Sequence, residues 1–176
     1  MFHPHVTLFS LNDTDKTRNE LVNITRSVVA EVEAPISLEG AGVQIGEAFH
    51  ESVYLALKST AGLMALRTNF LKAVGAQTNT ESPESPHASL YYGEGSIERN
   101  THVVRTMMEA RVINIRSDGL LDVVGLELRL DLTEIWIVDI PTDQPMDWKV
   151  VYKQALVGAK LAPSSLILQP LRLYLS

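Results

Sequence analysis

Two short strings of similar residues carry the side chains of this sequence that are suited to acid–base chemistry. His5 and Thr7 stand two residues apart in one string, and His87 and Ser89 have the same spacing in the other. Side chains two apart on a β-strand project from the same face, so each string presents an imidazole beside a hydroxyl. Imidazoles change charge near neutral pH, and hydroxyls donate hydrogen bonds to anions. The pattern therefore indicates two histidines for general acid and base catalysis, with phosphate as the expected anion.

The residues around the two strings distinguish them from chance matches. A proline stands before each histidine, at Pro4 and Pro86, and a leucine follows each hydroxyl, at Leu8 and Leu90. A third histidine-x-serine string, at residues 50–52, has neither neighbour, and we interpret it as coincidental. The shared setting favours two matched strands that serve one site.

The other histidines and the large side chains have structural interpretations. His3 and His5 have a spacing that can bind a metal ion, but no nearby carboxylate or cysteine completes the set, so we expect no metal site. We expect surface or helix-face positions for two further histidines, His50 and His102. We expect core positions for four large side chains, namely Trp136, Trp148, Met107 and Met108.

The composition limits the class of protein. The chain has 176 residues, 45% of them hydrophobic, which is enough for one domain with a substantial core. The net charge is -6 and no run of Lys or Arg exceeds two residues, which argues against a long nucleic acid as partner. Cysteine is absent, which excludes disulfides and thiolate metal sites. No stretch resembles a secretion signal or a bilayer span, so we expect a soluble, intracellular and cytoplasmic protein.

Hydrophobic periodicity predicts the elements that would hold the first string. Residues 5–11 alternate as a strand, with His5, Thr7 and Phe9 on one face. The elements that follow are a helix over 14–33 capped by residues 12–14, strands over 36–45 and 53–57, and a helix over 60–74 that Gly75 ends.

A polar segment precedes the second string. Residues 77–86 contain two prolines and no large apolar residue, which predicts a linker at the boundary between two lobes. After the strand that begins at His87, the pattern predicts a helix over 97–112, with its inward residues at Val103, Met107, Met108 and Val112. It then predicts a turn at 118–119, strands over 122–130 and 134–140, and an element of undecided type over 148–156. The order strand, helix, strand, strand thus occurs twice.

Three stretches of the chain resemble a known family. The two strings lie within HPHVTLFS and SPHASLYYG, and a later stretch reads TEIWIVDIPTDQPMDWKVV. Over about residues 3–155 the chain resembles the 2H phosphoesterase superfamily, in its cyclic nucleotide phosphodiesterase branch of fungi and plants. The resemblance implies a bilobal α+β fold in which two antiparallel sheets, with helices outside, face a central cleft.

We therefore expect a single bilobal domain over 1–176, with a motif-1 half at 1–76, the linker at 77–86, a motif-2 half at 87–155 and a tail at 156–176. Relatives begin with an extra strand and helix, whereas only four residues precede His5 here. The apolar run at 166–174 is a candidate for that sheet position. An unfilled apolar edge would favour self-association, and otherwise we expect a monomer.

The resemblance also implies an activity. Enzymes of this branch hydrolyse ADP-ribose 1″,2″-cyclic phosphate, a by-product of tRNA splicing, and nucleoside 2′,3′-cyclic phosphates, the latter to 2′-phosphates, without a metal or other cofactor. Carried onto this chain, His87 would be the base that activates water and His5 the acid that protonates the leaving ribose oxygen, although the reverse assignment stays open. Thr7 and Ser89 would hold the non-bridging phosphate oxygens.

Two aromatic residues complete the expected site. Tyr92 matches the family's tyrosine before glycine, which contacts the phosphate region. Strand alternation instead puts Tyr91 on the face of His87, so only a bulge or a strand end would bring Tyr92 to the site. Phe49 corresponds to an aromatic residue near the family's cleft and is a candidate for stacking on a base.

Other functions of the same superfamily remain alternatives. One is an enzyme that processes RNA ends or 2′-5′ linkages, which would need a positive groove that a net charge of -6 does not favour. Another is a nucleotide-binding module that has lost turnover. Resemblance to fungal relatives adds association with endomembranes or the Golgi as an alternative location. The expected partner throughout is a small cyclic nucleotide or ADP-ribose cyclic phosphate, not a membrane.

Overall fold

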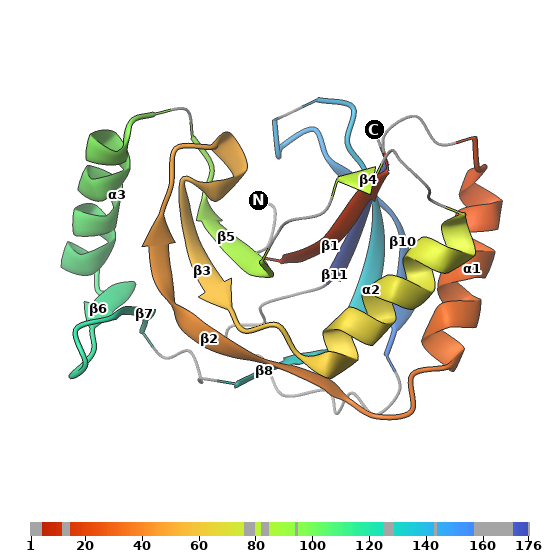
Figure 1. The fold of residues 1–176 in the computed structure, drawn as a ribbon. Coiled ribbons are helices and arrows are strands. Elements are labelled where there is room, and N and C mark those ends of the chain that lie inside the picture. The colour runs from red at the N-terminus through yellow and green to blue at the C-terminus, as the bar shows by residue number, and fades with distance from the viewer. Residues whose placement is uncertain are drawn as a thin grey trace.

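The computed structural model describes residues 5–11, 15–75, 80–81, 85–93, 95–124, 129–142, 144–156 and 171–175. The fold is α+β, with curled sheets and helices outside them, which confirms the expected class (Figure 1). Its helical elements are α1 (Arg18–Ala30), the 3-10 turn η1 (Phe49–Glu51), α2 (Ala61–Val74) and α3 (Ile97–Glu109). Its strands are β1 (Val6–Leu11), β2 (Ile36–Ile45), β3 (Val53–Leu57), β4 (Thr80–Glu81), β5 (His87–Tyr91), β6 (Ile113–Ile115), β7 (Leu121–Val123), β8 (Arg129–Leu132), β9 (Glu134–Asp139), β10 (Lys149–Ala155) and β11 (Leu171–Leu175).

The main sheet joins the two motif strands at its middle. Its order is β10-β9-β11-β1-β5-β3-β2-β8, with β4 paired to β1. The strands β1 and β5 are antiparallel and pair through Val6 and Ala88. Figure 1 shows α1 and α2 beside the β1 side of the sheet and α3 beside the β2 and β3 side.

The two halves of the sequence interleave in this sheet. Strands β2 and β3 follow the first motif in the chain, yet they lie on the β5 side, while β9 and β10 from the second half lie on the β1 side. The strand order alone does not test whether the linker at 77–86 divides two lobes, so that expectation stays a prediction. Part of that linker forms β4, whose residues pair with Ser10 and Leu11 of β1, and residues 76–79 and 82–84 lie outside the described residues.

A strand from the C-terminal tail lies in the middle of the sheet. The strand β11 is parallel to both of its neighbours, β1 and β9. This confirms, for residues 171–175, the expectation that the apolar tail occupies a sheet position beside the first motif strand. The rest of that run, residues 166–170, lies outside the described residues. The sheet accordingly contains two parallel pairs in addition to the antiparallel ones.

The two helices after β1 begin and end at recognisable caps. Thr17 caps α1 through a capping box with Glu20, so the helix starts later than the expected residue 14, and residues 12–14 lie outside the described part. Thr60 caps α2, and Gly75 closes it with a φ of 70°, as expected. The four apolar residues expected on the inner face of α2 are all buried, namely Leu63, Leu66, Phe70 and Val74.

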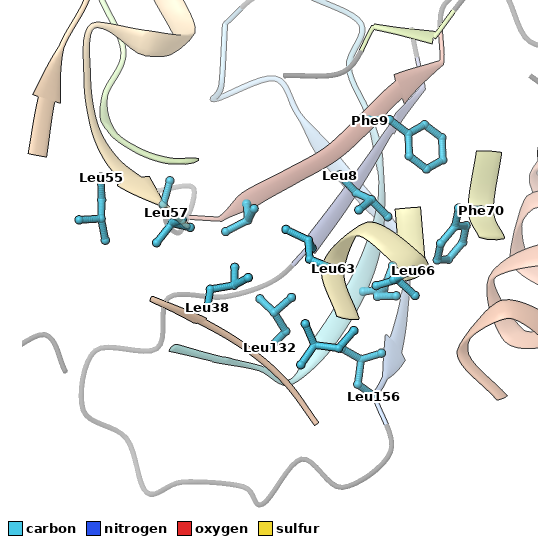
Figure 2. Packing of buried hydrophobic residues seen from close by; sticks show 14 of the residues in the cluster. Leu8, Phe9, Leu38, Leu55, Leu57, Leu63, Leu66, Phe70, Leu132 and Leu156 are labelled. Carbon is cyan, nitrogen blue, oxygen red and sulfur yellow. The ribbon is translucent and has the colours of Figure 1, made fainter. Parts of the chain in front are cut away.

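The main hydrophobic core lies between these helices and the sheet (Figure 2). A register irregularity in β1 between Thr7 and Phe9 changes which side chains enter it. Phe9 is fully buried, with its ring 6.1 Å from that of Phe70. The expected shared face of His5, Thr7 and Phe9 is therefore wrong for Phe9, because the irregularity interrupts the alternation along β1.

The second half departs most from the sequence prediction. In α3 the buried apolar residue is Val104, Val103 and the two methionines are half-buried, and Val112 is exposed beyond the end of the helix. The strand expected over 122–130 is two strands, β7 and β8, and residues 125–128 between them lie outside the described part. The undecided element at 148–156 is the strand β10.

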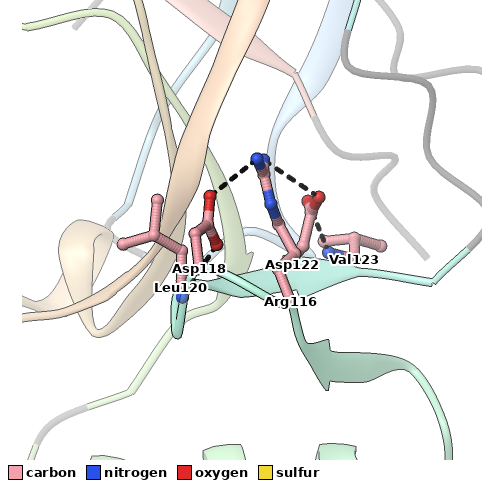
Figure 3. A network of polar contacts seen from close by, with 5 residues as sticks. All are labelled: Arg116, Asp118, Leu120, Asp122 and Val123. Carbon is pink, nitrogen blue, oxygen red and sulfur yellow. Dashed lines mark hydrogen bonds and ion pairs between the residues drawn. The ribbon is translucent and has the colours of Figure 1, made fainter.

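A separate hairpin of β6 and β7 packs beside β2. Its turn contains Asp118 and Gly119, as expected, and Gly119 has a φ of 83°, which a glycine adopts easily. Figure 3 shows Arg116 between Asp118, at 2.9 Å, and Asp122, at 3.7 Å. These ion pairs close the turn end of the hairpin, whose Ile113 and Val123 are buried in the main core.

Candidate active site

The two motif strings meet at their middle residues. Val6 and Ala88 stand at the centre of the two strings, pair across β1 and β5, and are buried in the core. In an antiparallel pair, this register puts His5 opposite Ser89 and Thr7 opposite His87, on the other face from Val6 and Ala88. Residues that are diagonal neighbours in such a pair have side chains about 7–8 Å apart. The register thus gathers two imidazoles and two hydroxyls around the junction of the two motif strands.

His87 has a polar environment. Its Nδ1 lies 3.2 Å from the carbonyl oxygen of Ser85 and 3.7 Å from a carboxylate oxygen of Glu51. The ring of Tyr54, from β3, makes an edge contact with the ring of His87 at 5.3 Å. A carbonyl can only accept a hydrogen bond, so Nδ1 is the donor, and the lone pair of the neutral ring is on Nε2.

His5 has an aromatic environment. Its ring stacks on that of Tyr92 with 6.5 Å between centroids, and the edge of Trp148 lies 6.0 Å away. Trp148 is buried together with Trp136 and Val138, and Tyr92 packs against this second cluster. The two tryptophans are therefore core residues, as expected, and Trp148 also borders the site.

A bulge in β5 explains how Tyr92 reaches His5. Tyr54 pairs with Ser89, but the preceding residue, Val53, pairs with Tyr91, so β5 holds one extra residue there. The strand then ends at Tyr91, and Tyr92 follows it. The sequence prediction required either a bulge or a strand end, and the structure has both, so Tyr92 rather than Tyr91 contacts His5.

The close packing of the next residue supports this arrangement. A Cβ on Gly93 would lie 2.6 Å from the ring of Tyr91, so a larger residue there would require the Tyr91 side chain to shift. Phe49 lies at the same place, with its ring 6.1 Å from that of Tyr92. The structure therefore places Tyr92 against His5 and Phe49 beside Tyr92.

The two hydroxyl residues occupy different surroundings. Ser89 is buried and donates a hydrogen bond to the backbone carbonyl of His50. Thr7 is half-buried and lines a small pocket with Ser59, Arg67 and Pro86.

The loop over residues 46–52 fixes one wall of the site. Ser52, fully buried, donates to the carbonyl of Gly93 at 2.6 Å and accepts from the Gly93 amide at 3.2 Å. Asn100 of α3 donates to the carbonyl of Gly46 at 2.8 Å. These bonds tie the loop to β5 and to α3, and they hold η1 over the site.

Burial and the charge of Glu51 together affect the pKa of Tyr54 in this wall. Burial raises the pKa of Tyr54, and the negative charge of Glu51 raises it further. Tyr54 therefore remains a neutral phenol at physiological pH. Elsewhere, His50 and His102 are exposed, as expected, although the ring of His50 lies 5.9 Å from that of Trp148.

Comparison with known families identifies the family of this chain. A family model described as cyclic phosphodiesterase-like protein matches residues 1–156. The chain belongs to this family. It is a cyclic phosphodiesterase of the 2H phosphoesterase group, as its paired strings indicated. No curated protein matches the chain.

Two further findings concern the described part of this cyclic phosphodiesterase. None of its helices there is long and apolar enough to cross a membrane. No three histidine, cysteine or acidic side chains in the same residues gather closely enough to hold a metal ion. His3 lies outside the described residues.

Sequence reasoning missed part of the site of this cyclic phosphodiesterase. Glu51 and Ser52 belong to the string at 50–52 that we interpreted as coincidental, and it is indeed no motif strand but the turn η1 and the residue after it. Tyr54 was assigned only to a strand. The available signal was the position of this string directly before β3. Because β3 lies beside β5, the residues just before β3 lie next to one end of β5.

Proposed function

We propose that this cyclic phosphodiesterase hydrolyses nucleoside 2′,3′-cyclic phosphates to 2′-phosphates, and ADP-ribose 1″,2″-cyclic phosphate, by two-histidine catalysis without a metal ion. The observation that carries the proposal is the pairing of Val6 with Ala88, which sets the two strings side by side. The net charge of -6 favours a small ligand over a long RNA.

In the proposed reaction, Nε2 of His87 removes a proton from water while the water oxygen forms a bond to phosphorus. The bond between phosphorus and the 3′ oxygen breaks, and His5 donates a proton to that oxygen. The hydrogen bond from Nδ1 of His87 to Ser85 supports the role as base, because it leaves the lone pair on Nε2. Each positioned acid or base contributes about 10²–10⁴-fold to such a rate.

We further propose that Thr7 and Ser89 hold the non-bridging oxygens, which carry developing charge in the transition state. Ser89 would turn its hydroxyl from the His50 carbonyl to a phosphate oxygen. Tyr92 would border the phosphate beside His5, and Phe49 would stack on the base, because their rings lie 6.1 Å apart.

The test is hydrolysis of adenosine 2′,3′-cyclic phosphate with and without a chelator. We expect 2′-AMP as product, turnover that survives the chelator, and a loss of about 10²-fold or more in His87→Ala. His102→Ala is the matched control, because His102 is exposed on α3, and it should leave turnover unchanged. Comparing kcat/KM for ADP-ribose 1″,2″-cyclic phosphate would establish which substrate is preferred.

Three outcomes would overturn the proposal. Turnover abolished by the chelator would contradict catalysis without a metal. Binding of the cyclic nucleotide without turnover would identify a binding module, and cleavage confined to oligonucleotides would identify an RNA-processing enzyme.

A further inference from the structure

The carboxylate of Glu51 has no part in the reaction described so far. Its Oε1 lies 3.7 Å from Nδ1 of His87, whereas the proposed reaction uses Nε2. Ser85 supplies a neutral acceptor to the same nitrogen at 3.2 Å. Nδ1 of His87 therefore has two acceptors near it, the neutral carbonyl of Ser85 and the charged carboxylate of Glu51.

The backbone around Glu51 is held in place from several directions. Ser89 donates to the carbonyl of His50, just before Glu51, and Ser52, just after it, bonds to Gly93. A Cβ on Gly46 would lie 2.4 Å from the carbonyl oxygen of Glu51, so the loop packs against itself with no space for a side chain there. Although the Glu51 side chain is 44% exposed, its attachment point is fixed relative to β5.

The groups that face His87 come from three elements. Glu51 comes from η1, Tyr54 from β3, and His5 from the β1 side through the Val6–Ala88 register. Tyr54 is a neutral phenol at physiological pH, because burial and Glu51 raise its pKa. Glu51 is therefore the negative group of this set.

We propose that Glu51 is a positioning residue for His87: its carboxylate keeps the proton on Nδ1 and stabilises the imidazolium that forms when Nε2 takes a proton from water. This inference rests on the function proposed above. A carboxylate behind a catalytic histidine stabilises the charge that develops on the ring during the reaction. Glu51 itself takes up no proton and touches no substrate.

The test separates charge from shape by replacing Glu51 with its uncharged isostere. In Glu51→Gln we expect kcat to fall about tenfold with KM unchanged, because the lost interaction is stronger in the transition state. The carbonyl of Ser85 still holds Nδ1, which limits the loss. Glu47→Gln is the matched control, because Glu47 is exposed in the same loop, and its kcat should equal that of the wild type.

A double-mutant cycle with His87→Ala distinguishes this inference from the proposed function. If Glu51 acts through His87, Glu51→Gln costs less than about twofold in the His87→Ala background. A full tenfold loss in that background, a kcat of Glu51→Gln within about twofold of the wild type, or a rise in KM alone would overturn the inference. Wild-type turnover in His87→Ala itself would instead overturn the proposed role of His87.

Discussion

The two motif histidines have the same sequence setting and unlike surroundings. His87 faces the Ser85 carbonyl, the Glu51 carboxylate and the Tyr54 phenol. His5 lies among the rings of Tyr92 and Trp148. The acceptors lie at Nδ1 of His87 and leave the lone pair of the neutral ring on Nε2, as a base requires. The contrast supports a division of roles that the matching strings alone left open.

The strands that carry the two histidines are also supported differently. The strand β5 pairs with β3, which comes shortly before it in the chain and is itself paired to β2. The strand β1 pairs with β11, from the other end of the chain and beyond the residues that match the family. The first motif therefore depends on a distant segment, whereas the second depends on local neighbours.

The largest effect on this contrast is expected from a proline in β11. Leu173 pairs with Phe9 of β1 and with Ile137 of β9, so Leu173→Pro removes a backbone donor from the middle of the sheet. We expect the free energy of unfolding to fall by about 1–3 kcal/mol, because the substitution leaves a backbone acceptor without its donor, and we expect turnover to be lost. Urea unfolding and the hydrolysis assay would measure both.

The control is Ser176→Pro, just after β11, which should change neither quantity. An unchanged free energy of unfolding in Leu173→Pro would contradict the position of β11 between β1 and β9. In that case both motif strands would depend on local neighbours alone.

A smaller effect is expected beside the second motif at high pH. The pKa of Tyr54 is raised in the folded protein by burial and by Glu51, so its contribution to stability is complete below the unfolded value and is lost as pH rises through the folded one. Wild-type protein should therefore lose more stability than Tyr54→Phe between about pH 9 and pH 11. Urea unfolding across that range measures the difference, and equal losses would contradict the raised pKa of Tyr54 in the folded protein.

Much of the fold follows from local patterns in the sequence. The inner face of α2, its end at Gly75, and the strands β2 and β3 match their predictions because alternation and capping are local effects. The presence of strands from both halves of the chain on each side of the sheet was not predictable from such local patterns. Which strand pairs with which depends on contacts between distant segments, and the packing of β11 against β1 is the clearest case.

The site divides in the same manner. His5, His87, Thr7 and Ser89 were predicted as site residues because one motif occurs twice. The sequence analysis named a bulge only as something Tyr92 would need in order to reach the site. No single residue type predicts a bulge, and the position of this one, at Leu90, follows from the register between β3 and β5. The position of Glu51 was not predicted, because a carboxylate on a turn comes to lie near His87 only through the packing of the strands around it.

The central claim is that His87 acts as the base and His5 as the acid on one phosphate. The pH dependence of kcat/KM for adenosine 2′,3′-cyclic phosphate tests it most directly, with the wild type compared to His5→Ala and His87→Ala. A bell-shaped wild-type profile is expected, because the base must be free of its proton and the acid must carry one. His87→Ala should lose the limb at low pH and His5→Ala the limb at high pH. Loss of the opposite limbs, or a wild-type profile that rises steadily with pH, would contradict the account.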